Sequence, residues 1–365
     1  MNSRTEFTDI YADDEMIERV TEVMQSGRFV KGRECVQFEN EFASAVGANH
    51  AIGVSNGTAA LLLALQAHGV GPGDEVFIPA HTFFATASPV AHLGAQPVFV
   101  DIDPETYTID VDDVESKIAE STTPTAIMPV HIYGQMADMR AITKIATDHD
   151  LVVIEDACQA HMATREGQTA GTAGDVGCFS FYPSKNMTVG GDGGMIVTDD
   201  AHIADHIRAL RNHGRGEDGI HRHLGLNHRL DETNAAVGRV QLEHIERWSI
   251  QRNDAAQRYT DQLTEIPEVT VPTEVSDAFH VYHLYVIQAP DRDDLRAHLD
   301  ARGIDTGIHY ATPAHAHPAM QAVVGEVHLP VAEALCDRIV SLPMHPRIEP
   351  DAIDRVCSGI AAYYT

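Results

Sequence analysis

Short apolar runs alternate with longer amphipathic stretches over the first two-thirds of the chain. Residues 51–55 (AIGVS) predict a buried strand, and residues 58–69 (TAALLLALQAHG) predict the helix after it. Further strands are predicted in the runs EVFIPA, PVFVDI, TAIMPV, LVVIED and GCFSFY. Continuous apolar runs are typical of strands that are buried on both faces. Strand–helix alternation of this kind predicts an α/β fold with a mainly parallel sheet covered by helices on both faces.

The last third of the chain has a different pattern. From residue 233 to about residue 266 the spacing predicts one long helix, a spine between two domains. The segments YHLYVIQA, RDDLRAHLDARG, TGIHY and PDAIDRVCSGIAAYY then mix strand and helix patterns. A chain of 365 residues is long enough for two cores. We therefore expect a large domain over residues 1–245, including an N-terminal segment, and a smaller α+β domain over residues 246–365.

The composition is strongly acidic. Asp and Glu number 54 against 25 for Lys and Arg, which gives a net charge of −29. The acidic residues are spread along the chain, so we expect neither nucleic acid nor a membrane as a partner. An excess of carboxylates with few lysines is typical of halophilic proteins, in which salt screens the repulsion. The alternative is an ordinary acidic protein of a mesophile.

Apolar runs and cysteines bear on the compartment. No run of eighteen apolar residues occurs, and the first eleven residues are polar and acidic, so we expect no membrane span and no signal peptide. The five cysteines are scattered and form no CxxC pair. We therefore expect neither a disulfide framework nor a zinc site. We expect a cytoplasmic protein without a metal.

Ligands of open α/β sheets bind beyond the carboxyl ends of the strands, so candidate chemistry is sought there. Asn56-Gly57-Thr58 follows the first predicted strand and opens a helix. Small residues at a helix N-terminus can bind a phosphate group through backbone N–H groups, and Thr58 adds a hydroxyl. The same residues are also favoured as a plain helix cap, and both interpretations stay open.

Two other strand ends carry charged or aromatic side chains. Glu155 and Asp156 end the run LVVIED, where a carboxylate could bind a ribose, a metal or a protonated ring nitrogen, or simply cap a helix. One carboxylate with His161 is not a metal-ligand set. Phe83 and Phe84 follow EVFIPA; one ring could stack on a flat cofactor, or both could belong to the core.

Lys185 lies in the segment FYPSKNMTVGGDGG, which is small, glycine-rich and follows an aromatic strand. The chain has four lysines and therefore 25 − 4 = 21 arginines. Arginine can replace lysine as a charge, but it cannot form an imine with a carbonyl group. Burial depresses the pKa of a lysine and makes it a nucleophile. A solvated surface lysine is the alternative.

Together these residues fit pyridoxal phosphate, which needs an amine, a carboxylate for its ring nitrogen, phosphate donors and a stacking surface. The chain also resembles the DegT/DnrJ/EryC1/StrS sugar aminotransferases, a branch of the fold-type-I pyridoxal phosphate enzymes. The resemblance covers nearly the whole chain and includes the segments SNGTAALLLAL, PAHTFFATASPV, VHIYGQMADM, IEDACQAHMA, FSFYPSKN, GDGGMIVTDD and GLNHRLDETNAAVGRVQLEHIERW. It implies a seven-stranded, mainly parallel sheet in the large domain.

The resemblance implies roles for residues around the cofactor ring. Lys185 matches the lysine that bonds to the cofactor and later moves protons. Asp156 matches the carboxylate paired with the ring nitrogen. Gln159 matches the side chain near the ring's 3′ oxygen, and Phe83 matches the aromatic residue stacked on the ring.

It also implies roles at the phosphate and at the substrate. Gly57, Thr58 and Ser180 match phosphate ligands. Asn227 matches an asparagine that reaches the phosphate of the neighbouring subunit, so a homodimer with shared active sites is expected. The pair His309-Tyr310 matches a segment of the small domain near the substrate.

Two segments depart from the family pattern. The family usually has GYNYRM where this chain has GLNHRL over residues 225–230, and often HYP where this chain has His309-Tyr310-Ala311. Neither change touches the cofactor chemistry, but both put the sugar and nucleotide contacts in doubt.

The resemblance implies transfer of an amino group from glutamate (or glutamine) to a nucleotide-linked keto-sugar in amino-sugar, glycan or polysaccharide biosynthesis. In the segments FYPSK and GDGG, the chain resembles family members that aminate C-3 more than those that aminate C-4. Alternatives are an aromatizing or cyclitol-acting relative and a non-catalytic sensor with the same fold. A deoxysugar dehydratase would have His in place of Lys185.

Overall fold

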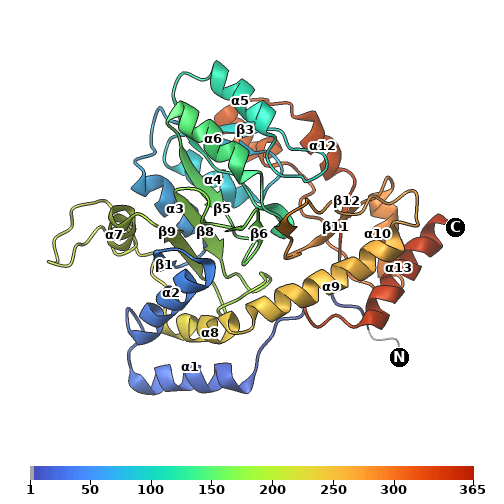
Figure 1. Cartoon of the computed structure of the whole chain (residues 1–365), viewed down its shortest axis with the longest axis horizontal. Helices are drawn as coiled ribbons and strands as arrows, with labels where there is room; N and C mark the ends of the chain where they lie inside the picture. The colour runs from blue at the N-terminus through green and yellow to red at the C-terminus, as the bar shows by residue number, and fades with distance from the viewer. Residues whose placement is uncertain (1–3) are drawn as a thin grey trace.

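A computed structural model describes residues 4–365; the first three residues of the predicted N-terminal segment lie outside the described residues. One sheet of seven strands forms the centre of the molecule (Figure 1). Its strand order is β1-β9-β8-β5-β4-β2-β3. The bounds are β1 His50–Val54, β2 Glu75–Pro79, β3 Gln96–Val100, β4 Pro124–Ile127, β5 Val152–Asp156, β8 Val176–Ser180 and β9 Gly194–Thr198.

The sheet is mainly parallel, as the sequence predicted. Only β9 runs antiparallel to its neighbours, β1 and β8. The strands are buried on both faces: Phe77 and Val153 lie in one hydrophobic cluster, and the residues after them, Ile78 and Ile154, lie in the other. This alternation is what a sheet between two helical layers requires.

Helices cover both faces of this sheet (Figure 1). In chain order they are α2 Arg33–Val46, α3 Gly57–Ala67, α4 Ser88–His92, α5 Val111–Glu120, α6 Met139–His149 and α7 Ala201–Leu210. Helix α1 (Asp14–Ser26) lies outside this layer and packs on a later helix, α8 (Glu232–Leu242). Three short 3₁₀ turns add to them: η1 Phe84–Thr86, η2 Ile132–Gly134 and η3 Ala314–Ala316.

The spine that the sequence predicted as one helix is two helices. They are α8 (Glu232–Leu242) and α9 (Ile245–Leu263), and the chain turns between them, where the His244 N–H donates to the Gln241 carbonyl at 3.0 Å. No glycine or proline marks this break, so the periodic pattern runs across it. Figure 1 shows α8 beside the large sheet and α9 continuing to the small domain.

The small domain is an α+β unit, as predicted. Its strands β11 (Tyr285–Gln288) and β12 (Ile339–Leu342) are antiparallel and share a hydrophobic cluster with α9. Its helices are α10 Arg292–Asp300, α11 Pro318–Val324, α12 Pro330–Cys336 and α13 Pro350–Tyr364. The N-terminal segment also contacts it, since Thr5 pairs with Ile304.

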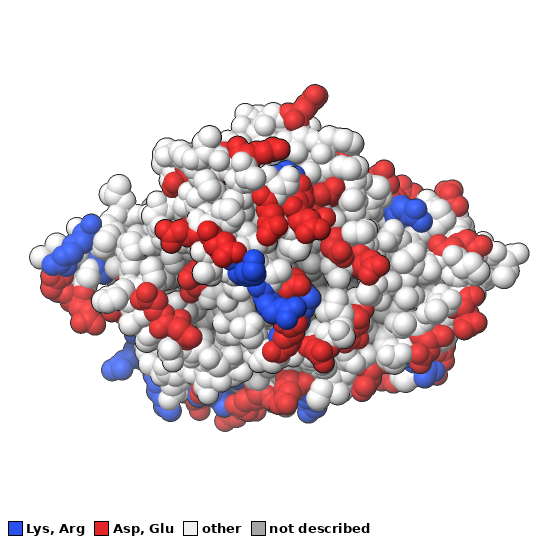
Figure 2. Space-filling model, turned by 45° about the horizontal axis from the view of Figure 1, so that its top comes forward, with Lys and Arg blue, Asp and Glu red and all other residues white. Residues whose placement is uncertain are grey.

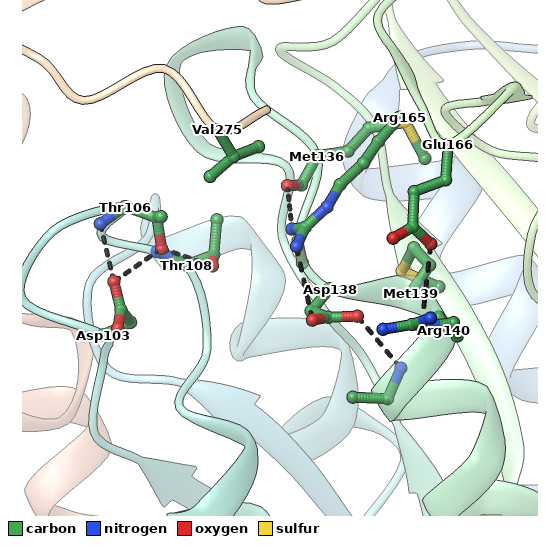
Figure 3. Close-up of polar contacts among 12 residues, drawn as sticks. Asp103, Thr106, Thr108, Met136, Asp138, Met139, Arg140, Arg165, Glu166 and Val275 are labelled. Atoms are coloured by element: carbon green, nitrogen blue, oxygen red, sulfur yellow. Dashed lines mark hydrogen bonds and ion pairs between the residues drawn. The ribbon is translucent and has the colours of Figure 1, made fainter. Parts of the chain in front are cut away.

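A three-stranded sheet braces the loop after β4. It consists of β6 Thr164–Arg165, β7 Gln168–Thr169 and β10 Ala278–Phe279. The Arg165 guanidinium donates to the Met136 carbonyl and to the Asp138 carboxylate, both at 3.3 Å (Figure 3). Asp138 in turn caps α6 through the Ala141 N–H. These contacts fix the loop on which Tyr133, a contact of the candidate site, is placed.

Candidate active site

Lys185 follows β8 and is half-buried, with its N–H donating to the Tyr182 carbonyl at 2.8 Å. Burial lowers the pKa of Lys185, and the neighbouring Cys158 and Asp156 oppose that shift. A depressed pKa raises the fraction of neutral amine, which is the form that attacks a carbonyl group. The alternative of a solvated surface lysine is therefore wrong.

Asp156 ends β5 and is 5% exposed. The Thr86 hydroxyl donates to its Oδ2 at 2.7 Å, and the Cys158 N–H donates to its Oδ1 at 3.2 Å. Thr82 lies 2.7 Å behind Thr86. A carboxylate oxygen accepts more than one hydrogen bond, so Asp156 keeps capacity for a ligand N–H. The sequence did not single out Thr86, although it lies three residues after Phe83.

The Glu155 carboxylate does not face the candidate site. Its buried carboxylate accepts from His131 Nε2 at 2.7 Å and from the N–H groups of Gly171, Ala173 and Gly174 at 2.6–2.9 Å. Since its neighbour Asp156 contacts Thr86 and Cys158, the two strand-end carboxylates have separate surroundings. Glu155 fixes a loop, and Asp156 belongs to the candidate site.

Gln159 connects the large domain to the small one. Its Oε1 accepts from the Tyr133 N–H at 2.8 Å, and its Nε2 donates to the Tyr310 hydroxyl at 3.1 Å. The Tyr133 hydroxyl bonds to the His309 carbonyl and lies 2.5 Å from His81 Nε2. The sequence missed Tyr133 and His81; both lie just after strands, which is the signal that could have found them.

Tyr310 lies beside Gln159 and Phe83, and the role of His309 and Tyr310 near the substrate stays a prediction. Burial, and then the nearby Lys185, lower the pKa of His309 to about 4, so its imidazole is neutral at pH 7. His309 Nδ1 lies 2.8 Å from the Ser341 hydroxyl. Burial, and then the charge of Asp156, raise the pKa of Tyr310.

Phe83 is 54% exposed, and its ring lies 5.6 Å from that of Tyr310, tilted by 40°. It is thus not a core residue. Phe84, by contrast, packs against the core. An exposed ring beside Tyr310 offers a stacking surface for a flat ligand.

At Gly57, the start of α3 packs closely against the end of β8. A Cβ at Gly57 would lie 2.7 Å from Ser180 Cβ and 3.0 Å from Cys158 Sγ, so only glycine fits here. Asn56 caps the helix, accepting from the Ala59 N–H at 2.8 Å. Thr58 is exposed. The cap and the phosphate-cradle interpretations are therefore compatible, because Asn56 performs the first and leaves Gly57 and Thr58 for the second.

Asn227 lies on an exposed loop between α7 and α8. Its backbone pairs with Asn212, and the His228 carbonyl next to it accepts from the Ser55 N–H at 3.0 Å. The side chain forms no hydrogen bond with any residue of the described range 4–365. Its reach to a neighbouring subunit stays a prediction.

These residues fit pyridoxal phosphate. The Gly57–Ser180 contact is a cradle that a single Cβ would fill, Asp156 has free acceptor capacity, and the amine of Lys185 has a lowered pKa. A half-buried lysine and a strand-end carboxylate near a predicted phosphate cradle are what a fold-type-I pyridoxal phosphate enzyme requires.

Comparisons with known proteins agree with this class. The DegT/DnrJ/EryC1/StrS aminotransferase family matches residues 11–361. A "Pleiotropic regulatory protein" of Geobacillus stearothermophilus is 45% identical over 96% of this chain and 94% of its own length. A dTDP-3-amino-3,4,6-trideoxy-alpha-D-glucose transaminase of Streptomyces venezuelae is 41% identical over 99% of this chain and 97% of its own.

A solved structure is similar over the whole chain. DesV of S. venezuelae, crystallised in complex with a ketimine intermediate, superposes with a TM-score of 0.96 at 40% identity, over 100% of this chain and 99% of its own. The chain therefore belongs to the DegT/DnrJ/EryC1/StrS aminotransferase family. It is a pyridoxal-phosphate-dependent enzyme of the sugar aminotransferase type.

Proposed function

We propose that this enzyme moves the amino group of glutamate to C-3 of a nucleotide-linked keto-sugar. The observation that carries the proposal is the half-buried Lys185, whose pKa is lowered by burial and which lies beside Asp156 and Cys158. The transaminase of S. venezuelae, which is named for a 3-amino sugar, supports C-3 over C-4.

Each site residue has a role in this proposal. Pyridoxal phosphate, when bound, supplies an electron sink that stabilises negative charge on a substrate carbon. Gly57, Thr58 and Ser180 hold its phosphate, Phe83 stacks on its ring, and Asp156 accepts the N–H of its ring nitrogen. Gln159 orients the ring oxygen, and His309 and Tyr310 border the substrate.

Lys185 acts as the proton carrier. Its lowered pKa lets the neutral amine accept a proton from the Cα atom of the amino-group donor and then deliver it to a second carbon atom. Asp156, fixed by Thr86, offers its carboxylate as the acceptor for the N–H of the ring nitrogen. The buried Tyr133, Gln159 and His81 contacts hold the site's wall in place.

The proposal extends to assembly and pathway. A homodimer with shared active sites, in the cytoplasm, is part of the proposal. The exposed Asn227 supports the dimer, as do Leu224 and Leu226, which are 93% and 57% exposed on the same loop. Amino-sugar biosynthesis for a glycan or surface polysaccharide would consume the product. Among the described residues, no helix is long and apolar enough to cross a membrane.

Labelled nitrogen tests the proposal. Glutamate carrying isotopic nitrogen is incubated with the enzyme and a panel of dTDP- and UDP-linked 3-keto and 4-keto sugars. We expect the label in the amino group of a 3-amino sugar, with an equal amount of 2-oxoglutarate. Label found only in 4-amino sugars would assign the amination to C-4 instead of C-3. Transfer of the label to a keto-cyclitol, and to none of the sugars, would point to a cyclitol-acting relative.

The name of the Geobacillus relative favours a second candidate, a regulatory protein. A sensor needs to bind its ligand but has no need of turnover. If glutamate yields no 2-oxoglutarate in a single-turnover assay while the cofactor stays bound, the sensor is the better account. The depressed pKa of Lys185 favours the enzyme.

A further inference from the structure

Residues 281–284 (VYHL) connect β10 to β11 without regular secondary structure, and we call them the 281–284 segment. All four residues are buried: Val281 is 0% exposed, Tyr282 4%, His283 7% and Leu284 5%. A buried segment that belongs to no helix or strand must find partners for its backbone polar groups elsewhere. Those partners show which parts of the molecule the segment joins.

One side of the 281–284 segment is held by Arg252 of α9, which is 5% exposed. Its Nη1 donates to the carbonyl groups of Tyr282 at 3.1 Å and His283 at 3.4 Å. The same nitrogen donates to the Met344 carbonyl at 3.2 Å, just after β12. This buried guanidinium therefore fixes the segment to α9 and to the small domain.

The other side of the segment contacts two loops of the candidate site. Asn186, the residue after Lys185, donates its Nδ2 to the Val281 carbonyl at 3.0 Å. The Val281 N–H donates to the Gly134 carbonyl at 3.1 Å, in the loop after β4. A Cβ at Gly134 would lie 2.9 Å from Val281 Cγ2, so this close approach requires glycine. The segment thus joins the loop of Lys185 to the small domain.

The contacts of the Asn186 side chain fix its orientation. A carbonyl oxygen can only accept, so the amide nitrogen faces Val281 and the amide oxygen is left for His283. Asn186 Oδ1 lies 3.2 Å from His283 Nδ1, so that ring nitrogen carries the hydrogen. Burial, and then the charge of Lys185, hold the pKa of His283 well below 6.5, which agrees with a neutral ring. Asn186 is 4% exposed, and both ends of its amide are bonded to the segment.

The backbone around Lys185 is therefore held on both sides. On the N-terminal side, the Lys185 N–H donates to the Tyr182 carbonyl at 2.8 Å. On the C-terminal side, Asn186 is bonded to Val281 and His283. A reacting group that is misplaced by about 1 Å can lose about a hundredfold in rate. Contacts that fix the backbone of Lys185 restrict where its flexible side chain can place the amine.

We propose that Asn186 and His283 are positioning residues for Lys185, because they fix the backbone from which its amine reaches the cofactor. This inference rests on the proposed function, in which Lys185 bonds to the cofactor. Neither side chain has to contact the cofactor or the substrate, since both act through the backbone next to Lys185. Their loss should therefore slow the reaction of Lys185 with the cofactor and leave the non-covalent binding of the cofactor unchanged.

Two measurements on the full-length enzyme, freed of cofactor, separate these effects. In the first, pyridoxal phosphate is added, borohydride stops the reaction at set times, and mass spectrometry follows the pyridoxyl group on Lys185. In the second, equilibrium dialysis measures the affinity for pyridoxamine phosphate, which has no aldehyde and cannot bond to lysine. Asn186→Ala and His283→Phe should each slow the first reaction about tenfold or more. Their affinity for pyridoxamine phosphate should stay within about threefold of the wild type.

Three further variants make the test specific. His283→Gln keeps an N–H donor for Asn186 Oδ1 and should react faster than His283→Phe. The double variant Asn186→Ala/His283→Phe should be no slower than the slower single variant, because both changes remove the same contact. Asn253→Ala is the matched control and should react as the wild type does. Asn253 donates from α9 to the His280 carbonyl at 3.4 Å, just before the segment, so this variant removes an amide on the α9 side.

Wild-type reaction rates at Lys185 in Asn186→Ala and His283→Phe would overturn this inference alone. A loss of pyridoxamine phosphate affinity as large as the loss of rate would also overturn it, because the pair would then only maintain the fold of the site. An equal slowing in Asn253→Ala would do the same. A pyridoxyl group on a residue other than Lys185 in the wild type would overturn the proposed function together with this inference.

Discussion

At the residue scale, neighbouring side chains of one type have different tasks because their surroundings differ. Glu155 and Asp156 are adjacent, yet the first binds four donors of the protein and the second keeps acceptor capacity beside Lys185. Composition and spacing alone could not separate them. Phe83 and Phe84 differ in the same way, since only the first is exposed at the site.

Asp156→Asn tests the role of that carboxylate. An amide cannot hold a ring nitrogen protonated by charge pairing, and losing one partner of a buried charged pair costs about 3 kcal/mol or more. That corresponds to a roughly hundredfold loss of kcat/KM. Steady-state kinetics with glutamate measure it, with Asp148→Asn on the exposed face of α6 as the control. A loss of only a few-fold would reduce Asp156 to a structural role.

Buried histidines predict the direction of a pH effect on stability. Burial lowers the pKa of His81 to about 4 and those of His161 and His280 to about 3, from 6.5. The unfolded chain therefore binds more protons below pH 6.5, so the free energy of unfolding falls as the pH falls from 6.5 toward 4. Denaturant titrations at pH 7.5 and 5.5 in molar salt should show lower stability at pH 5.5; equal or higher stability would contradict the assignment.

His161→Phe provides the matched variant for that measurement. Both ring nitrogens of His161 lack a hydrogen-bond partner in the described structure, and the ring lies among Phe179 and Phe181 at 5.5–5.7 Å. Replacing it with Phe should flatten the pH dependence between 7.5 and 5.5. An unchanged slope would show that His161 does not contribute.

At the element scale, the sequence located most strands closely. EVFIPA spans residues 75–80 and β2 spans Glu75–Pro79, because a run that is apolar on both faces reports burial directly. It did not single out β9, a short strand after a glycine-rich loop, and it merged α8 with α9. Apolar patterns report which faces are buried, not which way a strand runs or where a helix bends. The contacts of Thr86 and Tyr133 depend on tertiary structure in the same way.

The start of α3 gives the next prediction. A Cβ at Gly57 would lie 2.7 Å from Ser180 Cβ, inside the predicted phosphate cradle. Gly57→Ala should therefore weaken pyridoxal phosphate binding about tenfold or more, a change of about 1.4 kcal/mol. Gly71→Ala is the matched control, because its nearest neighbour lies 4.0 Å away. Equal cofactor affinity in the two variants, measured by equilibrium dialysis, would place the phosphate elsewhere.

At the scale of the whole molecule, charge dominates. Acidic side chains are scattered over the face seen in Figure 2, with fewer basic ones among them. A dimer would carry 2 × −29 = −58 charges. The Debye length falls from about 30 Å at 0.01 M salt to about 3 Å at 1 M. Repulsion between subunits should therefore weaken as salt is added.

Salt and assembly should thus be coupled. We expect the dimer and the bound cofactor to disappear together as salt is lowered, and added pyridoxal phosphate to restore part of the dimer. Sedimentation together with cofactor absorbance across a salt series measures both. A monomer with full cofactor occupancy and full activity would rule out a shared site, and with it the role of Asn227.

The central claim is that Lys185 bonds to the cofactor and carries the proton. Reduction of the loaded enzyme with borohydride, followed by peptide mass spectrometry, tests it most directly. The account predicts one pyridoxyl group on Lys185 in the wild type and in the control Lys144→Ala. It predicts none in Lys185→Ala or Lys185→Arg, which should fold but transfer no amino group. A pyridoxyl group on another residue, or near-wild-type turnover by Lys185→Ala, would contradict it.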